Sequence, residues 1–269
     1  MDCASCSAAL RAVAAASDER LEALGGLWDP WGGTPPEGAS APAAVSEAPT
    51  DVSAFVAWLA RTATRDLEIA ADTNRTSADE ARTLAAAALG RYASAVTIAQ
   101  AYGIDLDAGL DQALLINDRV NAASRQGVQT WSIDLFDAPA ISPSFAPSGK
   151  DLASSQELSS AVATWDCTAS TLPQAQVSAG TLTDAYAVSG ELLTRADTAL
   201  RAGAADTRTP RCTLGFLDAP SLASNLLAAD SAMLASNSSD VRSAGASAAL
   251  ADIQQWAPRT SLPALIGTR

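Results

Sequence analysis

Hydrophobic and polar residues recur with a helical period along the stretch from Asp51 to Gly103. In its first half, the apolar residues share one face of a helix that completes a turn about every 3.6 residues. They are Val52, Phe55, Val56, Leu59, Ala63, Leu67 and Ala70. The opposite face carries Arg61, Arg65, Glu68 and Asp72. The pattern predicts an amphipathic helix over 51–72 that buries one side.

The second half of this stretch repeats the pattern. Its apolar stripe consists of Ala81, Leu84, Ala88, Tyr92, Ala95, Ala99 and Tyr102. Ser77 is followed three positions later by Glu80, which is the spacing of a capping box at a helix start. A short polar break at 73–76 separates the two halves. We therefore predict a helical hairpin, around which the rest of the chain is organised.

Similar patterns predict further helices over 7–24, 104–126, 151–165, 181–203, 221–236 and 239–256. For the helix over 181–203 we expect an inner face made of Leu182, Ala185, Tyr186, Ser189, Leu193, Ala196 and Leu200. Prolines predict irregular segments over 127–150, around Cys167 and Pro173, and from Pro210 to Pro220. The tail after 256 is expected to be a proline-containing apolar strap.

These elements predict an all-α fold. We expect a four-helix bundle of two helical hairpins, to which the helices near 51–72, 77–102 and 181–202 and the closing pair contribute, with extra short helices and long proline-rich loops. The expected organisation is an N-terminal helix over 1–25, a linker rich in Pro, Gly and Ala over 26–50, and the bundle over 51–269.

Composition supports helices and excludes some partners. Hydrophobic residues make up 48% of the chain but aromatic residues only 5%, so alanine, the best helix former, supplies much of the apolar content. The chain has 17 Lys and Arg residues against 30 Asp and Glu, a net charge of −13, so we expect no nucleic-acid partner. No apolar run approaches the roughly 18 residues of a membrane span. A lipid anchor upstream of this sequence stays open.

The absence of histidine narrows the chemistry further. Ser-His-Asp and Cys-His catalysis, imidazole bases and all metal sites that contain histidine are excluded. We find no catalytic motif, and we expect no cofactor and no bound metal.

The cysteines favour an extracytoplasmic location, in the cell envelope or secreted. Cys3 and Cys6 have the CxxC spacing of a redox pair or half a zinc site, without the strand or second CxxC that would support either; processing or lipidation at these residues stays open. Cys167 and Cys212 lie in the loops expected on either side of the helix over 181–203. We expect them to form a disulfide, and pairing of Cys167 with Cys3 or Cys6 is the alternative.

Three ionisable residues, Asp66, Glu80 and Arg91, fall on otherwise apolar helix faces. Because a buried charge is costly unless it is paired, one interpretation is a buried polar cluster inside the bundle. The other interpretation is that Asp66 lies at the edge of its stripe, Glu80 caps its helix and Arg91 extends to solvent. We prefer the second, which requires no pocket.

Two alanine-rich hairpins separated by a long proline-rich crossing resemble the ferritin-like bundles. The layout from Asp51 to the closing WAPRTSLPALIG is similar to a ferritin-like family of uncharacterised lipoproteins and secreted proteins from high-G+C Gram-positive bacteria. Ferritin-like oxidases use Glu-x-x-His motifs to hold metals. Here Glu68, Glu80 and Glu191 are followed three positions later by alanine or threonine. The resemblance therefore implies a metal-free envelope protein with no assigned activity.

Two functions from different classes follow. The first is a non-catalytic cell-envelope or secreted protein that binds an unknown envelope protein or a small ligand. The alternative is a metal-binding protein or enzyme that uses carboxylates alone. In that case Asp66 and Glu80, with Asp197 or Asp230, would converge in the bundle core to hold Mg²⁺, Ca²⁺ or Mn²⁺.

Overall fold

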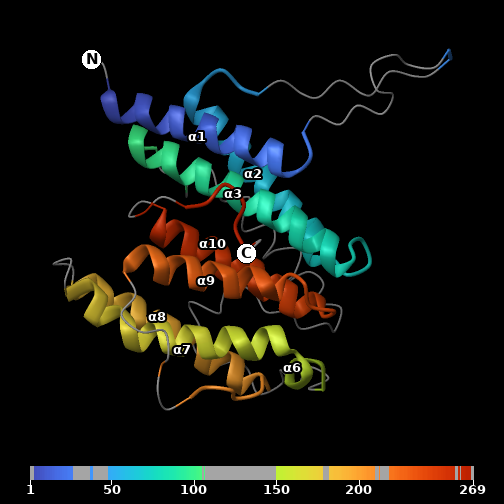
Figure 1. Ribbon diagram of the computed structural model, residues 1–269, viewed down its shortest axis with the longest axis vertical. Helices are drawn as coiled ribbons and strands as arrows, with labels where there is room; N and C mark the ends of the chain where they lie inside the picture. Colours follow the sequence, from blue (N-terminus) through green and yellow to red (C-terminus); the bar gives the residue numbers. More distant parts are fainter. Residues whose placement is uncertain are drawn as a thin grey trace.

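The chain folds into an all-α structure, as the periodicity predicts, in a computed structural model (Figure 1). The structure describes residues 3–26, 37–38, 48–104, 106, 150–177, 182–209, 212, 218–257, 260 and 262–267. These residues contain eight helices and no strand: α1 (Ala4–Ala23), α2 (Val52–Ala71), α3 (Ala78–Tyr102), α6 (Lys150–Ser154), α7 (Gln156–Val177), α8 (Leu182–Arg201), α9 (Ala219–Met233) and α10 (Ser239–Trp256). Most of three segments lies outside the described residues: the helix expected over 104–126, the crossing expected over 127–150 and the 26–50 segment.

Local sequence signals set the ends of α2 and α3. The Asp51 carboxylate accepts a hydrogen bond from the backbone N–H of Ala54 at 2.9 Å and caps α2. Ser77 and Glu80 form the predicted capping box, in which the Glu80 carboxylate accepts from the Ser77 N–H at 2.9 Å. α3 ends at Gly103, whose φ of 64° lies in the left-handed region that glycine adopts readily.

The helices form three layers, with the α9/α10 hairpin in the middle (Figure 1). On one side α2 packs against α3, and α1 packs on α3. On the other side α7 packs against α8. The middle hairpin touches both outer layers, since α10 contacts α2 and α3 while α9 contacts α7. This arrangement produces two hydrophobic cores that share α9 and α10.

The first core lies between the α1–α3 layer and the middle hairpin. Alongside many alanines it buries Val13, Val56, Leu59, Leu67, Leu89, Tyr92, Ile98, Leu227, Leu234 and Ile253. The small side chains allow close helix contacts. At Gly245 of α10, an added Cβ would lie only 2.6 Å from the carbonyl oxygen of Asp230 in α9, so α9 and α10 touch backbone to backbone there.

The second core lies between the middle hairpin and the α6–α8 layer. Its largest members are Trp165 of α7 and Trp256 of α10, both almost fully buried. Leu152, Leu158, Leu172, Leu192, Leu222 and Leu226 surround them. The helix expected over 181–202 was assigned to one core with the first hairpin. The structure corrects this assignment, because the buried side chains of α8 belong to the second core.

The inner face of α8 also differs from the expectation. Tyr186 and Leu193 were expected inside, but their side chains are 61% and 47% exposed. The buried face carries Val188 and Leu192 instead, and with them the charged residue Arg195, which is only 2% exposed. The buried face of α8 is therefore rotated from the predicted one and includes a charged residue.

Two prolines thought to lie in loops belong to helices. The helix expected to end at 165 continues through Pro173 to Val177, so Cys167 is a helical residue. A proline inside a helix removes one backbone hydrogen bond, but Ala169 and Leu172 beside it are buried in the second core, and this packing favours the continued helix. Pro220 lies in the first turn of α9, where its missing N–H breaks no helical bond.

The tail returns across the first core as a strap, described over residues 262–267. Ile266 is 1% exposed and its N–H donates to the carbonyl oxygen of Ala86 in α3 at 3.4 Å. The strap lies directly on Gly90, where an added Cβ would lie 1.9 Å from the carbonyl oxygen of Ala264. Glycine at position 90 therefore makes room for the strap, which forms one wall of the cleft described next.

Candidate functional site

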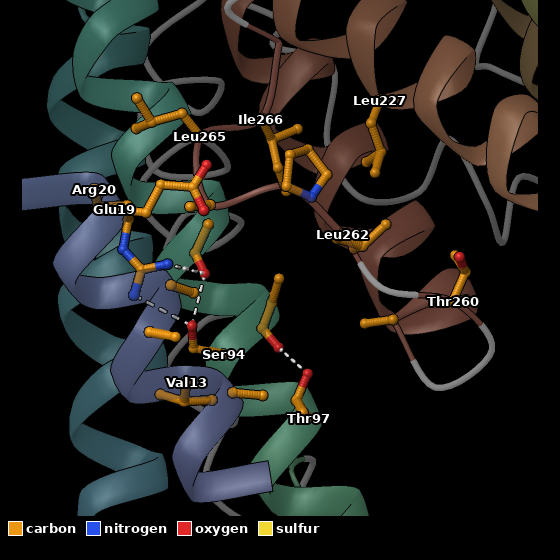
Figure 2. Close-up of a pocket in the computed structure, with 18 of the residues that line it drawn as sticks. Val13, Glu19, Arg20, Ser94, Thr97, Leu227, Thr260, Leu262, Leu265 and Ile266 are labelled. Atoms are coloured by element: carbon orange, nitrogen blue, oxygen red, sulfur yellow. Dashed lines mark hydrogen bonds between the residues drawn. The ribbon is translucent and has the colours of Figure 1, made fainter. Parts of the chain in front are cut away.

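A cleft of about 1230 Å³ opens between α1, α3, α9 and the C-terminal strap. In Figure 2, Arg20 reaches from α1 toward Ser94 of α3, with Leu227, Leu262 and Ile266 on the opposite wall. Most of the described lining is small and apolar. The alanines that line it are Ala9, Ala12, Ala15, Ala16, Ala93, Ala101, Ala228, Ala257 and Ala264. The volume is large enough for a small organic molecule.

Arg20 supplies the positive charge of the cleft. It lies in the last turn of α1 and is 8% exposed. One terminal nitrogen of its guanidinium donates to the carbonyl oxygen of Gly90 at 3.1 Å; the other donates to the hydroxyls of Ser17 at 2.9 Å and Ser94 at 3.3 Å. All three acceptors are neutral, so these bonds hold the side chain in place without cancelling its charge.

No carboxylate of the described residues lies within 4 Å of the Arg20 guanidinium. Burial lowers the pKa of Arg20, and the nearby charge of Arg91 lowers it further, while Glu19 acts in the opposite direction. Arg20 nevertheless keeps its proton, since an arginine is protonated under all ordinary conditions. The cleft therefore holds a cation that neighbouring side chains compensate only in part.

The structure separates the three residues of the possible polar cluster, which was the less favoured of the two interpretations. Arg91 of α3 pairs with Asp66 of α2 at 2.8 Å, and both side chains remain about a quarter exposed, at 28% and 24%. Glu80 caps the start of α3 and is exposed. Hydrogen bonds from the backbone and side chain of Ser77 lower the pKa of Glu80. A buried cluster of all three is therefore wrong, because Glu80 joins its own helix cap rather than the Asp66–Arg91 pair.

A different charged cluster, which the sequence analysis missed, lies inside the second core. Arg195 of α8 donates to both oxygens of Asp252 in α10, at 2.7 and 3.0 Å. The second carboxyl, Asp230 of α9, lies 3.7 Å from Arg195 and accepts a hydrogen bond from the indole N–H of Trp165 at 2.7 Å. The Arg195 guanidinium also lies 5.3 Å from the centre of the Trp165 ring, a cation–π distance. We call these four residues the Arg195 cluster.

Burial and the neighbouring charges shift the pKa values of the Arg195 cluster. Complete burial raises the pKa of Asp230 well above its usual value, and the neighbouring Asp252 raises it further, against the opposing effect of Arg195. Burial works against the charge of Arg195, but Asp252 and Asp230 outweigh it and raise the Arg195 pKa. The arrangement is thus a bidentate Arg195–Asp252 pair beside a carboxyl whose pKa is raised by burial.

The Arg195 cluster ties helices together and is closed to ligands. Its charged side chains are at most 6% exposed, and none of its members lines the cleft. The Arg195 guanidinium already supplies a positive charge to both carboxyls, at 2.7 Å from Asp252 and 3.7 Å from Asp230. A sequence signal did exist, because Asp230 and Asp252 are the charged residues within the mainly apolar segments LLAADSAML and AALADIQQW.

The acids of the alternative metal site are not brought together. Asp66 pairs with Arg91, Glu80 caps α3, Asp230 belongs to the Arg195 cluster, and Asp197 forms an exposed ion pair with Arg201 one turn along α8. Across the described ranges, no group of three or more Cys, Asp or Glu side chains has the geometry to hold a metal ion. The structure therefore gives these acids separate structural roles.

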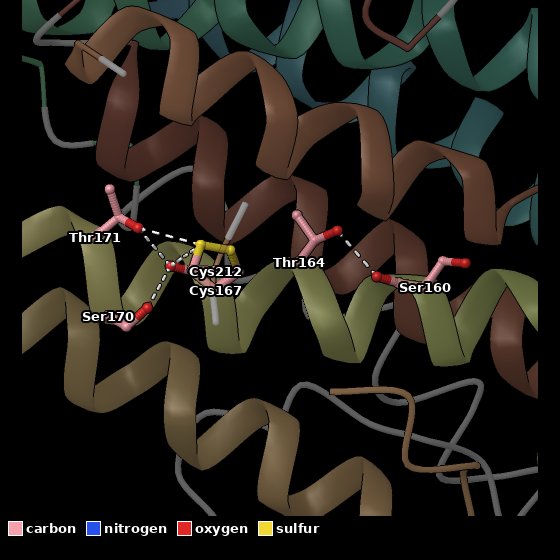
Figure 3. Close-up of a disulfide and its surroundings, with 6 residues drawn as sticks. All are labelled: Ser160, Thr164, Cys167, Ser170, Thr171 and Cys212. Carbon is pink, nitrogen blue, oxygen red and sulfur yellow. Dashed lines mark hydrogen bonds between the residues drawn. A yellow bond between two sulfur atoms is a disulfide. The ribbon is translucent and has the colours of Figure 1, made fainter. Parts of the chain in front are cut away.

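The cysteines form two pairs at disulfide distance. Cys3 and Cys6 are joined at the start of α1, with their Cα atoms 5.2 Å apart. Cys167 of α7 is joined to Cys212 with a Cα separation of 5.1 Å (Figure 3). Disulfides are typical of oxidising compartments outside the cytoplasm. None of the helices in the described residues is long and apolar enough to cross a membrane.

Comparison with known proteins adds no assignment: the chain matches no protein-family model, no curated protein and no solved structure.

Proposed function

We propose that this chain is a non-catalytic helical binding protein of the cell envelope or a secreted one, and that its ligand occupies the cleft beside Arg20. The observation that carries the proposal is the state of Arg20: this residue is 8% exposed in the wall of a cleft, and its hydrogen bonds to the described residues all go to neutral oxygens. An incompletely compensated buried charge favours a ligand of opposite charge, because the ligand supplies the missing partner.

The described cleft lining suits binding better than catalysis. A nucleophilic hydroxyl needs a base that takes its proton. Instead, the Ser94 hydroxyl donates to the carbonyl oxygen of Gly90 at 3.0 Å, and the Thr97 hydroxyl donates to that of Ala93 at 2.9 Å. The chain has no histidine to act as the base. These hydroxyls are therefore engaged by their own helix and can assist a ligand as hydrogen-bonding groups.

Two further parts belong to the same proposal. We infer that α2, α3, α9 and α10 are a ferritin-like four-helix unit, to which the α6–α8 layer is added on the other side. The joint contribution of these four helices to the first core supports it, together with their order as two hairpins along the chain. The two cysteine pairs support the extracytoplasmic location.

Native mass spectrometry of protein purified from its own host's envelope or medium tests the binding role. We expect a non-covalently bound molecule that is lost when Ala12→Trp fills the cleft from α1. Ala14→Trp is the matched control, because Ala14 is exposed on the same helix and does not line the cleft. A bound molecule retained by Ala12→Trp, or none in the unmodified protein, would contradict the proposal.

The carboxylate-only alternative makes the opposite prediction. If Asp66 held a divalent cation, millimolar Mn²⁺ or Ca²⁺ would raise the melting temperature by several degrees, since a ligand that binds only the folded state stabilises it. The substitution Asp66→Asn would abolish that rise. We expect no metal-dependent rise, because the Asp66 carboxylate is already paired with Arg91.

A further inference from the structure

The chemistry of the cleft narrows the class of ligand. Among its described lining residues, Arg20 is the only base and Glu19 the only acid. The remaining polar lining consists of hydroxyl, amide and backbone groups, contributed by Ser5, Ser94, Thr97, Gln100, Ser224 and Thr260. The binding determinant is therefore one guanidinium with a few hydrogen-bonding neighbours, which fits one anionic group on the ligand.

A carboxylate fits that guanidinium better than a phosphate does. Both groups accept paired hydrogen bonds from arginine. A phosphate monoester, however, carries a charge of about −1.5 to −2 near neutral pH. It would meet the Glu19 carboxylate in the same cleft and a chain whose net charge is −13. A monoanion balances Arg20 with the least repulsion from Glu19.

The rest of the lining fits an aliphatic body. The walls consist of alanine methyl groups together with Val13, Leu227, Leu262 and Ile266. The described lining has no Phe, Tyr or Trp on which an aromatic ring could stack. Methyl-lined walls that run along helices α1 and α3 suit a narrow hydrocarbon chain, whose burial is favourable in proportion to its area.

We propose that the cleft binds an aliphatic monocarboxylate, with its carboxylate on Arg20 and its hydrocarbon chain between α1, α3 and the strap. This inference rests on the proposed binding role and adds the ligand class to it. Ser94 lies beside the guanidinium, at 3.3 Å, so its hydroxyl is the neighbouring group able to turn toward the bound carboxylate.

Isothermal titration calorimetry of the purified, oxidised chain with decanoate tests the ligand class. Decanol has the same tail without the charge, and decyl phosphate replaces the head group. We expect decanoate to bind more tightly than either. Arg20→Gln should weaken decanoate binding by about tenfold or more, because it removes a buried charge-assisted interaction. Arg11→Gln removes the same charge from an exposed position on α1 outside the cleft, and should leave the affinity unchanged.

The outcomes are separable. Circular dichroism and melting temperature report whether Arg20→Gln is folded. If it does not fold, Arg20→Lys replaces it. Lysine keeps the charge but lacks the planar pair of donors, so Arg20→Lys should still weaken decanoate binding, by less than about tenfold. Equal affinity for decanol and decanoate, tighter binding of decyl phosphate, no decanoate binding, or no effect of either Arg20 variant would overturn the ligand class. If the ligand class is overturned but Ala12→Trp still releases the native ligand in mass spectrometry, the proposed binding role of the cleft stands. If Ala12→Trp does not release it, the binding role and the ligand class are both wrong.

Discussion

Arg195 of α8 holds Asp252 of α10 through two hydrogen bonds, in a site where the two side chains are 2% and 6% exposed. This pair joins the outer α7/α8 layer to the middle hairpin. It also explains the orientation of α8, because a helix that turned Tyr186 and Leu193 inward would carry Arg195 away from its partner. A charged residue therefore decides which side of an amphipathic helix is buried.

Arg195→Met should lower the free energy of unfolding by about 3–5 kcal/mol, because it leaves the buried Asp252 and Asp230 without their cation. Urea unfolding followed by circular dichroism measures the loss. The triple variant Arg195→Met, Asp230→Leu, Asp252→Leu should recover most of it, since an apolar cluster has no charge to desolvate.

Arg201→Ala is the control for that experiment. Its ion pair with Asp197 lies one turn apart on the exposed face of the same helix, with side chains 57% and 54% exposed. Such pairs contribute about 0.3–0.5 kcal/mol. An Arg195→Met loss as small as that of Arg201→Ala would show that the Arg195 cluster does not fasten α8.

The sequence predicts those elements whose signals are local. The capping box at Ser77, the stop at Gly103 and the apolar stripe of α2 all act within a few residues, so the first hairpin follows from them. The continuation of α7 through Pro173 does not, because it depends on burial of Leu172 in a core that distant helices build. Proline propensity is a local rule, and tertiary packing outweighs it here.

The sites were harder to predict for the same reason. Asp66 and Arg91 are paired through adjacent helices of one hairpin, so their approach follows from helical periodicity. The Arg195 cluster draws on four helices, and no periodicity along one of them reveals the other three. The pattern along α1 does not single out Arg20 either, because the helix that it contacts, α3, comes about 70 residues later in the chain.

The pH dependence of stability should reveal the buried Asp230 carboxyl. Burial and Asp252 raise the folded-state pKa of Asp230 above its unfolded value of about 3.9, so the folded chain holds this proton more tightly. The stabilising contribution is complete below the unfolded pKa and is lost as pH rises through the folded pKa. Asp230→Asn keeps the shape and removes the titration.

Urea unfolding of both proteins from about pH 4 to pH 8 isolates the effect. The free energy of unfolding of the unmodified chain, minus that of Asp230→Asn, should fall as pH rises across this range. All other carboxyls cancel in the subtraction, provided that the substitution leaves them undisturbed. A difference that stays constant with pH would mean that the Asp230 pKa is the same in the folded and unfolded chain, and one that grows would mean that folding lowers it; either result contradicts the prediction.

The two cysteine pairs should differ in their contribution to stability. Peptide mapping of the unreduced protein by mass spectrometry should recover Cys3–Cys6 and Cys167–Cys212, and a link from Cys167 to Cys3 or Cys6 would contradict the structure. Cys167 and Cys212 are separated by 45 positions. Replacing both with serine should therefore lower the free energy of unfolding by about 2–4 kcal/mol, because the disulfide no longer restricts the unfolded chain. The same change at Cys3 and Cys6, separated by 3, should cost less.

Gly90→Ala should loosen the strap. The added methyl group would overlap the carbonyl oxygen of Ala264, which approaches the position of a Cβ to 1.9 Å, so the strap must move away and expose Ile266. Hydrogen–deuterium exchange of the peptide over 260–269 should therefore become faster.

Gly190→Ala is the matched control in α8, where nothing lies within 4 Å of an added Cβ. There the better helix propensity of alanine should stabilise the fold by up to about 1 kcal/mol and leave strap exchange unchanged. Unchanged strap exchange in Gly90→Ala would mean that the contact with α3 does not hold the strap, and that the cleft wall depends on other contacts.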